Sequence, residues 1–202
     1  MSFNETKVDL LRDLNIDENE NFVNLNLMAE GETRYLRDLR INLKNTLNSE
    51  NLTIKEAYLI ALAVAVNEKN GILRDAFSQL AARNGATAAE LAEATGCASQ
   101  LAINNVFYRF KHFIRDTTES YQLMPAGIKM NIMMNPVLGK ELFELISLAV
   151  SAVNGCQSCV NSHEESVRKL SASDGNQSSS EARIFDAVRL ASIIRGLSVA
   201  LN

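Results

Sequence analysis

Proline and glycine are scarce in this chain, and that scarcity favours helices over short strands joined by tight turns. The 202 residues contain two prolines, Pro125 and Pro136, and nine glycines. Apolar residues also recur at the three- and four-residue spacing of a helix with one buried face. An early example of this spacing is Tyr35, Leu36, Leu39, Leu43 and Leu47. The sequence therefore predicts an all-α fold.

Capping signals divide the chain into successive helices. Thr53 and Thr87 each precede a glutamate by three residues, which is the capping-box pattern that opens a helix. The helix that starts at Thr87 is expected to be followed by a separate one over about residues 97–115. Pro136 is expected near the first turn of a long apolar helix that stops at Asn154-Gly155.

A weak internal repeat predicts two related helical halves. Residues 62–77 align with residues 149–164, and in both segments an apolar helix ends and a second helix follows. A period of roughly 90 residues that occurs twice fits paired halves better than a solenoid. The Asn- and Asp-rich start of the chain is predicted to be an appendage that wraps around the domain or has frayed ends, with room for one short helix. The expected organisation is an N-terminal extension over 1–31 and a helical domain over 32–202, with halves at about 32–120 and 121–202.

Charge and hydropathy exclude two classes of partner. The net charge of −4 gives no bulk electrostatic attraction to nucleic acid. The nearest basic cluster, Arg109, Lys111, His112 and Arg115, reads as a solvated helix face or part of an interface. The first ten residues lack the apolar core of a signal peptide, and the longest apolar runs are roughly half the length that a bilayer requires. We therefore expect a cytoplasmic protein that binds neither nucleic acid nor membrane.

The residues that point to chemistry are Glu144, Cys156, Cys159 and His163. The two cysteines and the histidine lie at i, i+3 and i+7, which places them on one face of a helix. That helix is expected to begin just after Gly155, so that Cys156 lies in its first turn, where the helix dipole lowers a thiol pKa. If the two helices are antiparallel, Glu144 reaches the same height as His163 and can share protons with it.

These residue types suit redox chemistry at a dithiol. A thiolate attacks a peroxide and becomes a sulfenic acid, and a second thiol condenses with it to a disulfide. An imidazole oriented by a carboxylate can move the protons. A zinc site is the main rival, with Glu144 or Cys97 as the fourth ligand, but three ligands would then crowd into two turns of one helix. Cys97 by itself reads as a small buried hydrophobe.

At these residues the sequence resembles the AhpD alkylhydroperoxidases of the carboxymuconolactone decarboxylase superfamily. The family signature is a Glu, eleven residues, C-x-x-C, three residues and a His, and this chain matches it in full. The likeness extends to residues 104–109, 130–136 and 143–156, and it covers about residues 32–200.

The resemblance implies an all-helical fold of two related halves that assembles as a homo-oligomer, which is a trimer in the best-known members. It implies reduction of organic hydroperoxides without a cofactor. It also implies two partners, a peroxiredoxin (AhpC-like) that the protein returns to its reduced state and a dihydrolipoyl protein that donates the electrons.

The resemblance further assigns roles to the four residues. Cys159 would be the peroxidatic thiol, Cys156 its resolving partner and proton donor, and Glu144 and His163 the proton relay. Ser158 stands where the family commonly has a second histidine, and a hydroxyl cannot carry charge near neutral pH as imidazole can. A disulfide-exchange adaptor with little peroxidase activity, or a zinc-binding structural module, are the alternatives. A decarboxylase role is least favoured, because it would leave the paired cysteines without a task.

Overall fold

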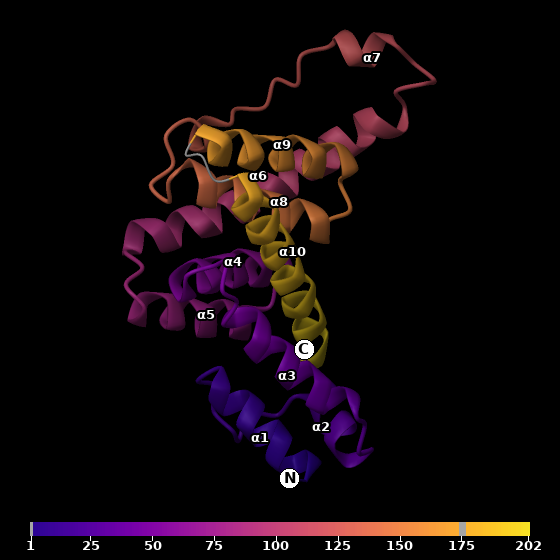
Figure 1. Cartoon of the computed structure of the whole chain (residues 1–202). Helices are drawn as coiled ribbons and strands as arrows, with labels where there is room; N and C mark the ends of the chain where they lie inside the picture. Colours follow the sequence, from indigo (N-terminus) through magenta and orange to yellow (C-terminus); the bar gives the residue numbers. More distant parts are fainter. Residues whose placement is uncertain (1, 174–176) are drawn as a thin grey trace.

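The computed structural model describes residues 2–173 and 177–202, and within these ranges every regular element is helical (Figure 1). The all-α prediction is therefore confirmed. In chain order the elements are α1 (Phe3–Asp13), α2 (Val23–Glu30), α3 (Tyr35–Leu47), α4 (Ile54–Asn67), α5 (Gly71–Arg83), α6 (Ala88–Phe113), α7 (Ser120–Leu123), the 3-10 turn η1 (Asn131–Met133), α8 (Lys140–Val153), α9 (Gln157–Ser173) and α10 (Gln177–Ala200).

Helix α4 lies at the centre of the core and is in contact with α5, α6, α8 and α10. A helix surrounded on several sides must be apolar around most of its circumference, which explains the long apolar run in this part of the sequence. Its buried residues are Ala57, Leu59, Ile60, Ala61, Leu62, Ala63, Val64 and Ala65. Helix α8 is the matching element of the second half and packs against α4, α6, α9 and α10.

The two halves repeat one pattern of helices. In each half an apolar helix turns back through a short loop into a second helix, and a long helix follows: α4, α5 and α6 in the first half, and α8, α9 and α10 in the second. This order agrees with the alignment of residues 62–77 with residues 149–164. The domain boundaries drawn from the sequence remain predictions.

The predicted capping boxes are present at the starts of α4 and α6. The hydroxyl of Thr53 accepts a hydrogen bond from the amide of Glu56, whose carboxylate accepts one in return from the amide of Thr53. Thr87 and Glu90 make the same pair of bonds. Each box satisfies amide groups that the first turn of a helix leaves without backbone partners.

Two predicted helix boundaries are wrong. Residues 88–113 form one continuous helix rather than two, because Ala94, Cys97 and Leu101 continue a single buried face at helical spacing. Helix α8 begins at Lys140 and not near Pro136. The residue before it, Gly139, has a φ of 79°, so the chain changes direction there, and Pro136 lies in the preceding loop.

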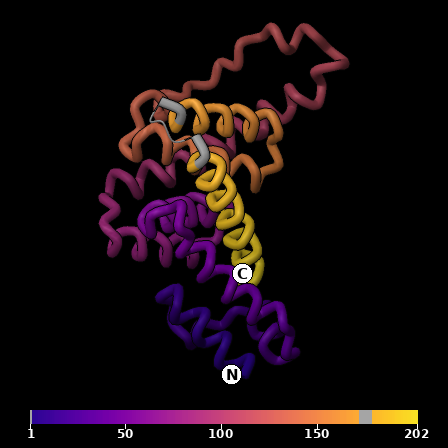
Figure 2. The backbone as a smooth tube through the Cα atoms, viewed as in Figure 1, coloured from indigo at the N-terminus to yellow at the C-terminus, as the bar shows by residue number. Residues whose placement is uncertain are grey.

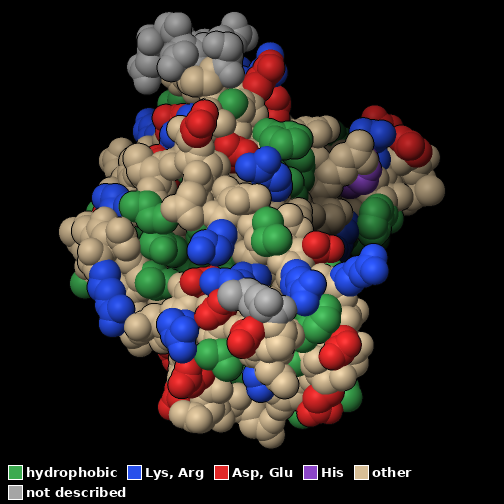
Figure 3. All heavy atoms as spheres, turned by 60° about the horizontal axis from the view of Figure 1, so that its bottom comes forward, with side chains coloured by type: hydrophobic (Ala, Val, Ile, Leu, Met, Phe, Trp, Pro, Cys, Tyr) green, Lys and Arg blue, Asp and Glu red, His purple; other side chains and the backbone are tan. Residues whose placement is uncertain are grey.

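The N-terminal stretch forms two helices where the sequence predicted one short helix. Leu10 of α1 and Leu25 of α2 are completely buried. Arg40 of α3 ties α1 down through ion pairs with Asp9 at 2.9 Å and Asp13 at 2.7 Å. Figure 2 shows these helices at the end of the molecule farthest from α7, and Figure 3 shows basic and acidic side chains interspersed over that end.

The segment between α6 and α8 leaves the body of the molecule and returns along α9 (Figures 1 and 2). Lys111 secures its outer part by donating hydrogen bonds to the backbone carbonyls of Gln122 and Met124. Its returning part contains η1, which packs against α6. Among the described helices, none combines the length and apolar character needed to span a bilayer.

Candidate active site

The turn between α8 and α9 places the cysteine pair. Gly155 has a φ of 67°, a left-handed conformation that glycine adopts without steric cost at the end of a helix. The carbonyl of Cys156 accepts the first intrahelical hydrogen bond of α9, from the amide of Val160 at 2.9 Å. Cys156 is therefore the capping residue, one position before the helix, and it is Cys159 that lies in the first turn. The prediction that Cys156 lies inside the first turn is wrong by this one residue.

A disulfide joins Cys156 and Cys159, whose Cα atoms are 5.3 Å apart. Cys156 is fully buried, whereas Cys159 is 7% exposed. The structure thus represents the oxidised form of the pair, and Cys159 is the cysteine that solvent can reach.

Glu144 of α8 and His163 of α9 form a hydrogen-bonded pair. The distance between Glu144 Oε2 and His163 Nδ1 is 2.7 Å, and both side chains are largely buried. The expectation that antiparallel helices bring these residues to the same height is therefore confirmed. A carboxylate at Nδ1 fixes the orientation of the imidazole and leaves Nε2 as the second ring nitrogen for proton transfer.

Cys159 lines a cavity of about 200 Å³. The walls come from three elements: α9, α6 and η1. The lining residues are Asn104, Tyr108, Met133, Ser158, Cys159, Ser162 and His163. Cys159, the less deeply buried cysteine, therefore lines the same cavity as the His163 imidazole, with room for a small substrate group. The sequence assigned no role to Asn104 or Tyr108, although both fall in the 104–109 segment of the family resemblance.

Ser158, which replaces the usual family histidine, lies between the cavity and the buried cysteine. Its Oγ is 3.7 Å from the Sγ of Cys156, and the residue also lines the cavity beside Cys159. A hydroxyl in this position can donate or accept a hydrogen bond, but it cannot carry a positive charge as a protonated imidazole does.

An amide cluster holds the turn that precedes Cys156. Asn154 and Asn67 exchange side-chain hydrogen bonds, and Asn154 also donates to Asn105 Oδ1 at 2.8 Å. Asn105, which is 2% exposed, in turn donates to Ser151 at 3.0 Å. Each member of the cluster thus has a partner, as buried polar groups require.

Arg109 completes this support by donating a hydrogen bond to the backbone carbonyl of Asn154 at 2.7 Å. The guanidinium therefore satisfies a carbonyl at the C-terminus of α8, where a cation is favoured by the helix dipole. The sequence predicts that Arg109 lies on a solvated helix face or in part of an interface. It does not reveal this hydrogen bond, because Arg109 and Asn154 are 45 positions apart.

The first half of the molecule has no cysteines at the corresponding turn. Sequence alignment placed Lys69 and Ile72 at the two positions. The loops after α4 and α8 are both three residues long, but α4 ends one residue later than that alignment implies. Asn70 therefore caps α5, and its side-chain oxygen accepts a hydrogen bond from the amide of Leu73. Asn70 and Leu73 therefore occupy the places that Cys156 and Cys159 hold in the second half.

Cys97 lies apart from the disulfide and is fully buried on α6. Its Sγ is 3.4 Å from Ser147 Oγ, and burial raises the pKa of its thiol to about 12. The expectation of a small buried cysteine is confirmed. Across the described residues, no group of three histidine, cysteine or acidic side chains is arranged to hold a metal ion.

Comparisons with known proteins agree with this site. Residues 120–201 match the Carboxymuconolactone decarboxylase family. The chain is 36% identical over 168 residues to "Alkyl hydroperoxide reductase AhpD" of Bradyrhizobium sp. (strain ORS 278), covering 83% of this chain and 87% of that protein. Proteins of the same name from Brucella anthropi and Beijerinckia indica subsp. indica are 38% and 40% identical over 83% of this chain, covering 90% and 88% of their own lengths. With an all-helical fold, the complete Glu-C-x-x-C-His signature and this similarity over most of its length, the chain belongs to the AhpD-type branch of the carboxymuconolactone decarboxylase superfamily.

Proposed function

We propose that this protein is an alkyl hydroperoxide reductase that cycles between a dithiol and a disulfide at Cys156 and Cys159. The observation that carries the proposal is the disulfide itself, whose accessible member opens onto a cavity shared with His163. The relatives named "Alkyl hydroperoxide reductase AhpD" support the choice of substrate class.

The cycle starts at the reduced pair. The thiolate of Cys159 attacks the terminal oxygen of R–O–O–H, the O–O bond breaks, and one proton converts the departing alkoxide to an alcohol. Cys159 is then a sulfenic acid. The thiol of Cys156 displaces its hydroxyl as water and forms the disulfide, so that each peroxide consumes two thiols and yields one alcohol and one water.

His163 and Glu144 serve the proton steps. His163 lines the same cavity as Cys159, and its Nδ1 is held by the Glu144 carboxylate at 2.7 Å. In this arrangement the imidazole takes the proton of the Cys159 thiol and returns one to the alkoxide, while Glu144 stabilises the imidazolium between the two events. Ser158 passes a proton to or from Cys156 by rotating its hydroxyl.

A dithiol must return the disulfide to its reduced form. We assign this role to a dihydrolipoyl group, which attacks the accessible sulfur of Cys159 and then closes its own ring to release the reduced pair. We place the reaction in the cytoplasm and in a homo-oligomer, with a peroxiredoxin as a further electron acceptor. The location is the expectation from the sequence, and the other assignments rest on the family resemblance.

Steady-state peroxidase assays on cysteine variants test the proposal. With cumene hydroperoxide and dihydrolipoamide, Cys159→Ser is expected to abolish turnover, and Cys156→Ser is expected to complete at most one turnover per protein. Cys97→Ser serves as the control and should keep the wild-type rate. Full turnover by Cys159→Ser would overturn the assignment.

The second candidate function is a disulfide-exchange adaptor that has little peroxidase activity. Ser158 favours it, because a hydroxyl supplies protons to a departing alkoxide less readily than an imidazolium does. Ser158→His separates the two functions. A large gain in peroxidase rate without a change in the rate of exchange with a peroxiredoxin disulfide would support the adaptor.

A further inference from the structure

A second cavity of about 320 Å³ lies next to the cavity that Cys159 lines. The two cavities share Met133 as a wall. The Glu144–His163 pair also bridges them, since Glu144 lines the second cavity and His163 lines the first. The residues around the second cavity are Met133, Met134, Pro136, Lys140, Phe143, Glu144, Ser166, Lys169 and Leu170.

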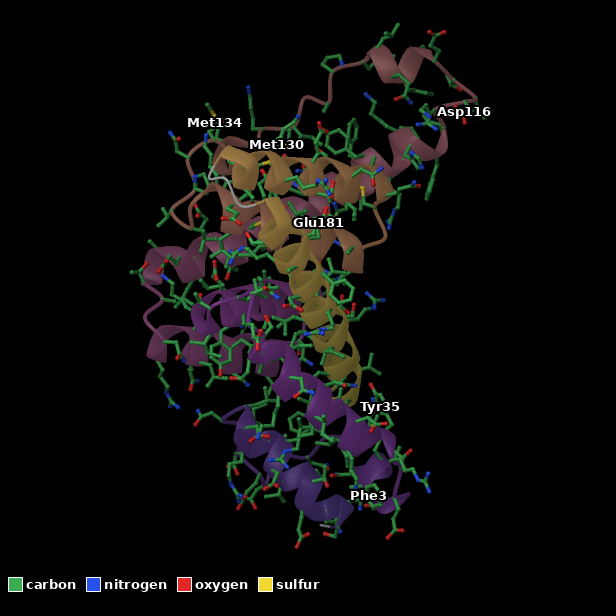
Figure 4. The ribbon with its side chains drawn as sticks, viewed as in Figure 1. Phe3, Tyr35, Asp116, Met130, Met134 and Glu181 are labelled. Carbon is green, nitrogen blue, oxygen red and sulfur yellow. A yellow bond between two sulfur atoms is a disulfide. The ribbon has the colours of Figure 1, made fainter. Side chains whose placement is uncertain are left out.

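Both cavities follow one face of α9. Cys159, Ser162, Ser166 and Lys169 recur at intervals of three or four residues, so their side chains form one stripe along the helix. The returning segment of the chain runs along α9, with Met130 nearer the middle of the helix and Met134 nearer its C-terminal end (Figure 4). Met133, Met134 and Pro136 of this segment line the same cavities as the stripe. The cavities are therefore successive parts of one groove between α9 and residues 130–136.

The groove changes character along its length. The cavity near Cys159 is the smaller of the two, and its walls carry hydroxyl and imidazole groups. Beyond Met133 the walls of the groove include Met134, Pro136, Phe143 and Leu170, which suit an acyl chain. Met133 divides the two parts, and an unbranched methionine side chain can move aside for a ligand more easily than a branched one.

Two lysines stand at the far part of the groove. Lys140 is the first residue of α8, and Lys169 lies near the end of α9. Lys169 pairs with Glu165 at 2.6 Å, but both side chains are exposed and such pairs are weak. Glu144, the acidic group of this cavity, already has one carboxylate oxygen bonded to His163. The far part of the groove therefore offers two ammonium groups to an anion.

We propose that the groove binds hydroperoxides of long-chain fatty acids, with the peroxide at Cys159 and the carboxylate between Lys140 and Lys169. This inference rests on the proposed function and adds the substrate class. Ten residues separate Cys159 from Lys169, which is about 15 Å along the helix and matches an extended chain of roughly a dozen carbons. A hydroperoxide near the middle or distal part of an eighteen-carbon acid satisfies this spacing.

The test compares the 13-hydroperoxide of linoleic acid with its methyl ester, both below their micelle concentrations. The wild-type kcat/KM is expected to be about tenfold higher for the acid, since the ester lacks the charge. Lys140→Met and Lys169→Met should each lower the value for the acid about three- to fivefold, and leave the value for the ester unchanged. Lys44→Met, which removes an exposed lysine on α3, is the control and should change neither value.

Inhibition by linoleate supplies a second readout, because linoleate has the carboxylate and the acyl chain but no hydroperoxide group. Linoleate should compete with cumene hydroperoxide, and both lysine variants should raise its inhibition constant. Equal kcat/KM values for acid and ester in the wild type, or lysine variants that alter both substrates alike, would overturn the proposal. Failure of the proposed function is a different result, because the wild type would then also fail to reduce cumene hydroperoxide.

Discussion

Asn67 and Asn154 are joined by two reciprocal amide hydrogen bonds, with N–O distances of 2.9 and 3.0 Å. Asn67 is the last residue of α4 and Asn154 is the residue that follows α8, so the bonds link the two halves near their matching turns. The turn after Asn154 leads directly to Cys156. The half without the redox pair therefore helps to hold the loop on which that pair depends.

Replacing Asn67 by alanine is expected to loosen that turn. The change removes both reciprocal bonds and leaves the Asn154 amide with fewer partners, so the free energy of unfolding should fall by about 1–3 kcal/mol. Chemical denaturation measures this loss. Disulfide formation after peroxide treatment should also slow in the folded variant. Asn48→Ala, at an exposed helix end, is the matched control, and equal losses in both variants would refute a special role for the pair.

Glu144→Gln tests the proton relay. Glutamine can still accept a bond from Nδ1 of His163, so the imidazole keeps its orientation but loses the charge that stabilises its protonated form. We expect the peroxidase rate to fall by roughly 10- to 100-fold, which is at or below the lower end of acid–base contributions because His163 itself is retained. Stopped-flow assays measure this rate, and the disulfide should still form. Glu164→Gln is the control on α9, and unchanged kinetics in Glu144→Gln would make Glu144 a structural residue.

Cys97 should resist alkylation in the folded protein. A thiol pKa of about 12 in place of 9.0 leaves about a thousandth of the ordinary thiolate fraction at pH 8. Iodoacetamide added to the reduced protein is therefore expected to label Cys159 and to leave Cys97 thiol intact, as peptide mass mapping would show. Labelling of Cys97 at the rate of Cys159 would contradict the burial of its thiol.

The ion pair between Glu56 and Arg183 should make the free energy of unfolding depend on pH. Burial by itself raises the pKa of Glu56, but hydrogen bonds from Arg183 and from the Thr53 amide outweigh it, so the pKa is lower than in the unfolded chain. A lowered carboxyl pKa stabilises the fold above the unfolded value of about 4.3, and this contribution is lost as pH falls through the folded value.

Glu56→Gln should remove that contribution. The difference between the free energies of unfolding at pH 7 and at pH 4 is expected to be smaller in Glu56→Gln than in the wild type. Urea denaturation at both pH values measures it. Glu20→Gln, in the loop between α1 and α2, is the control. The same pH difference in Glu56→Gln and the wild type would refute the assigned direction.

The sequence predicted the parts of the site that local spacing encodes. The C-x-x-C pair and His163 lie on one short stretch, so helix geometry suffices to place them on one face. Glu144 could be matched to His163 because residues at similar distances from a tight turn lie side by side on two antiparallel helices. The position of Cys156 was wrong by one residue, since a pattern locates the end of a helix less closely than its interior.

The supporting groups could not be predicted in the same way. Asn67 meets Asn154 across 87 positions, and Arg109 meets the Asn154 carbonyl across 45. These contacts depend on how α4, α6 and α8 pack, which periodicity does not specify. The position of Met133 in the cavity wall could not be predicted either. It depends on the path by which the segment between α7 and α8 returns along α9.

Oxidation of the reduced protein by one equivalent of cumene hydroperoxide tests the central claim most directly. The chain has three cysteines, and the thiol count after denaturation should fall from three to one, with one alcohol formed per protein. Peptide mapping should locate the new disulfide at Cys156 and Cys159, and Cys97 should remain a thiol. If the thiol count stays at three while the peroxide remains intact, the account of this protein as a hydroperoxide reductase is contradicted.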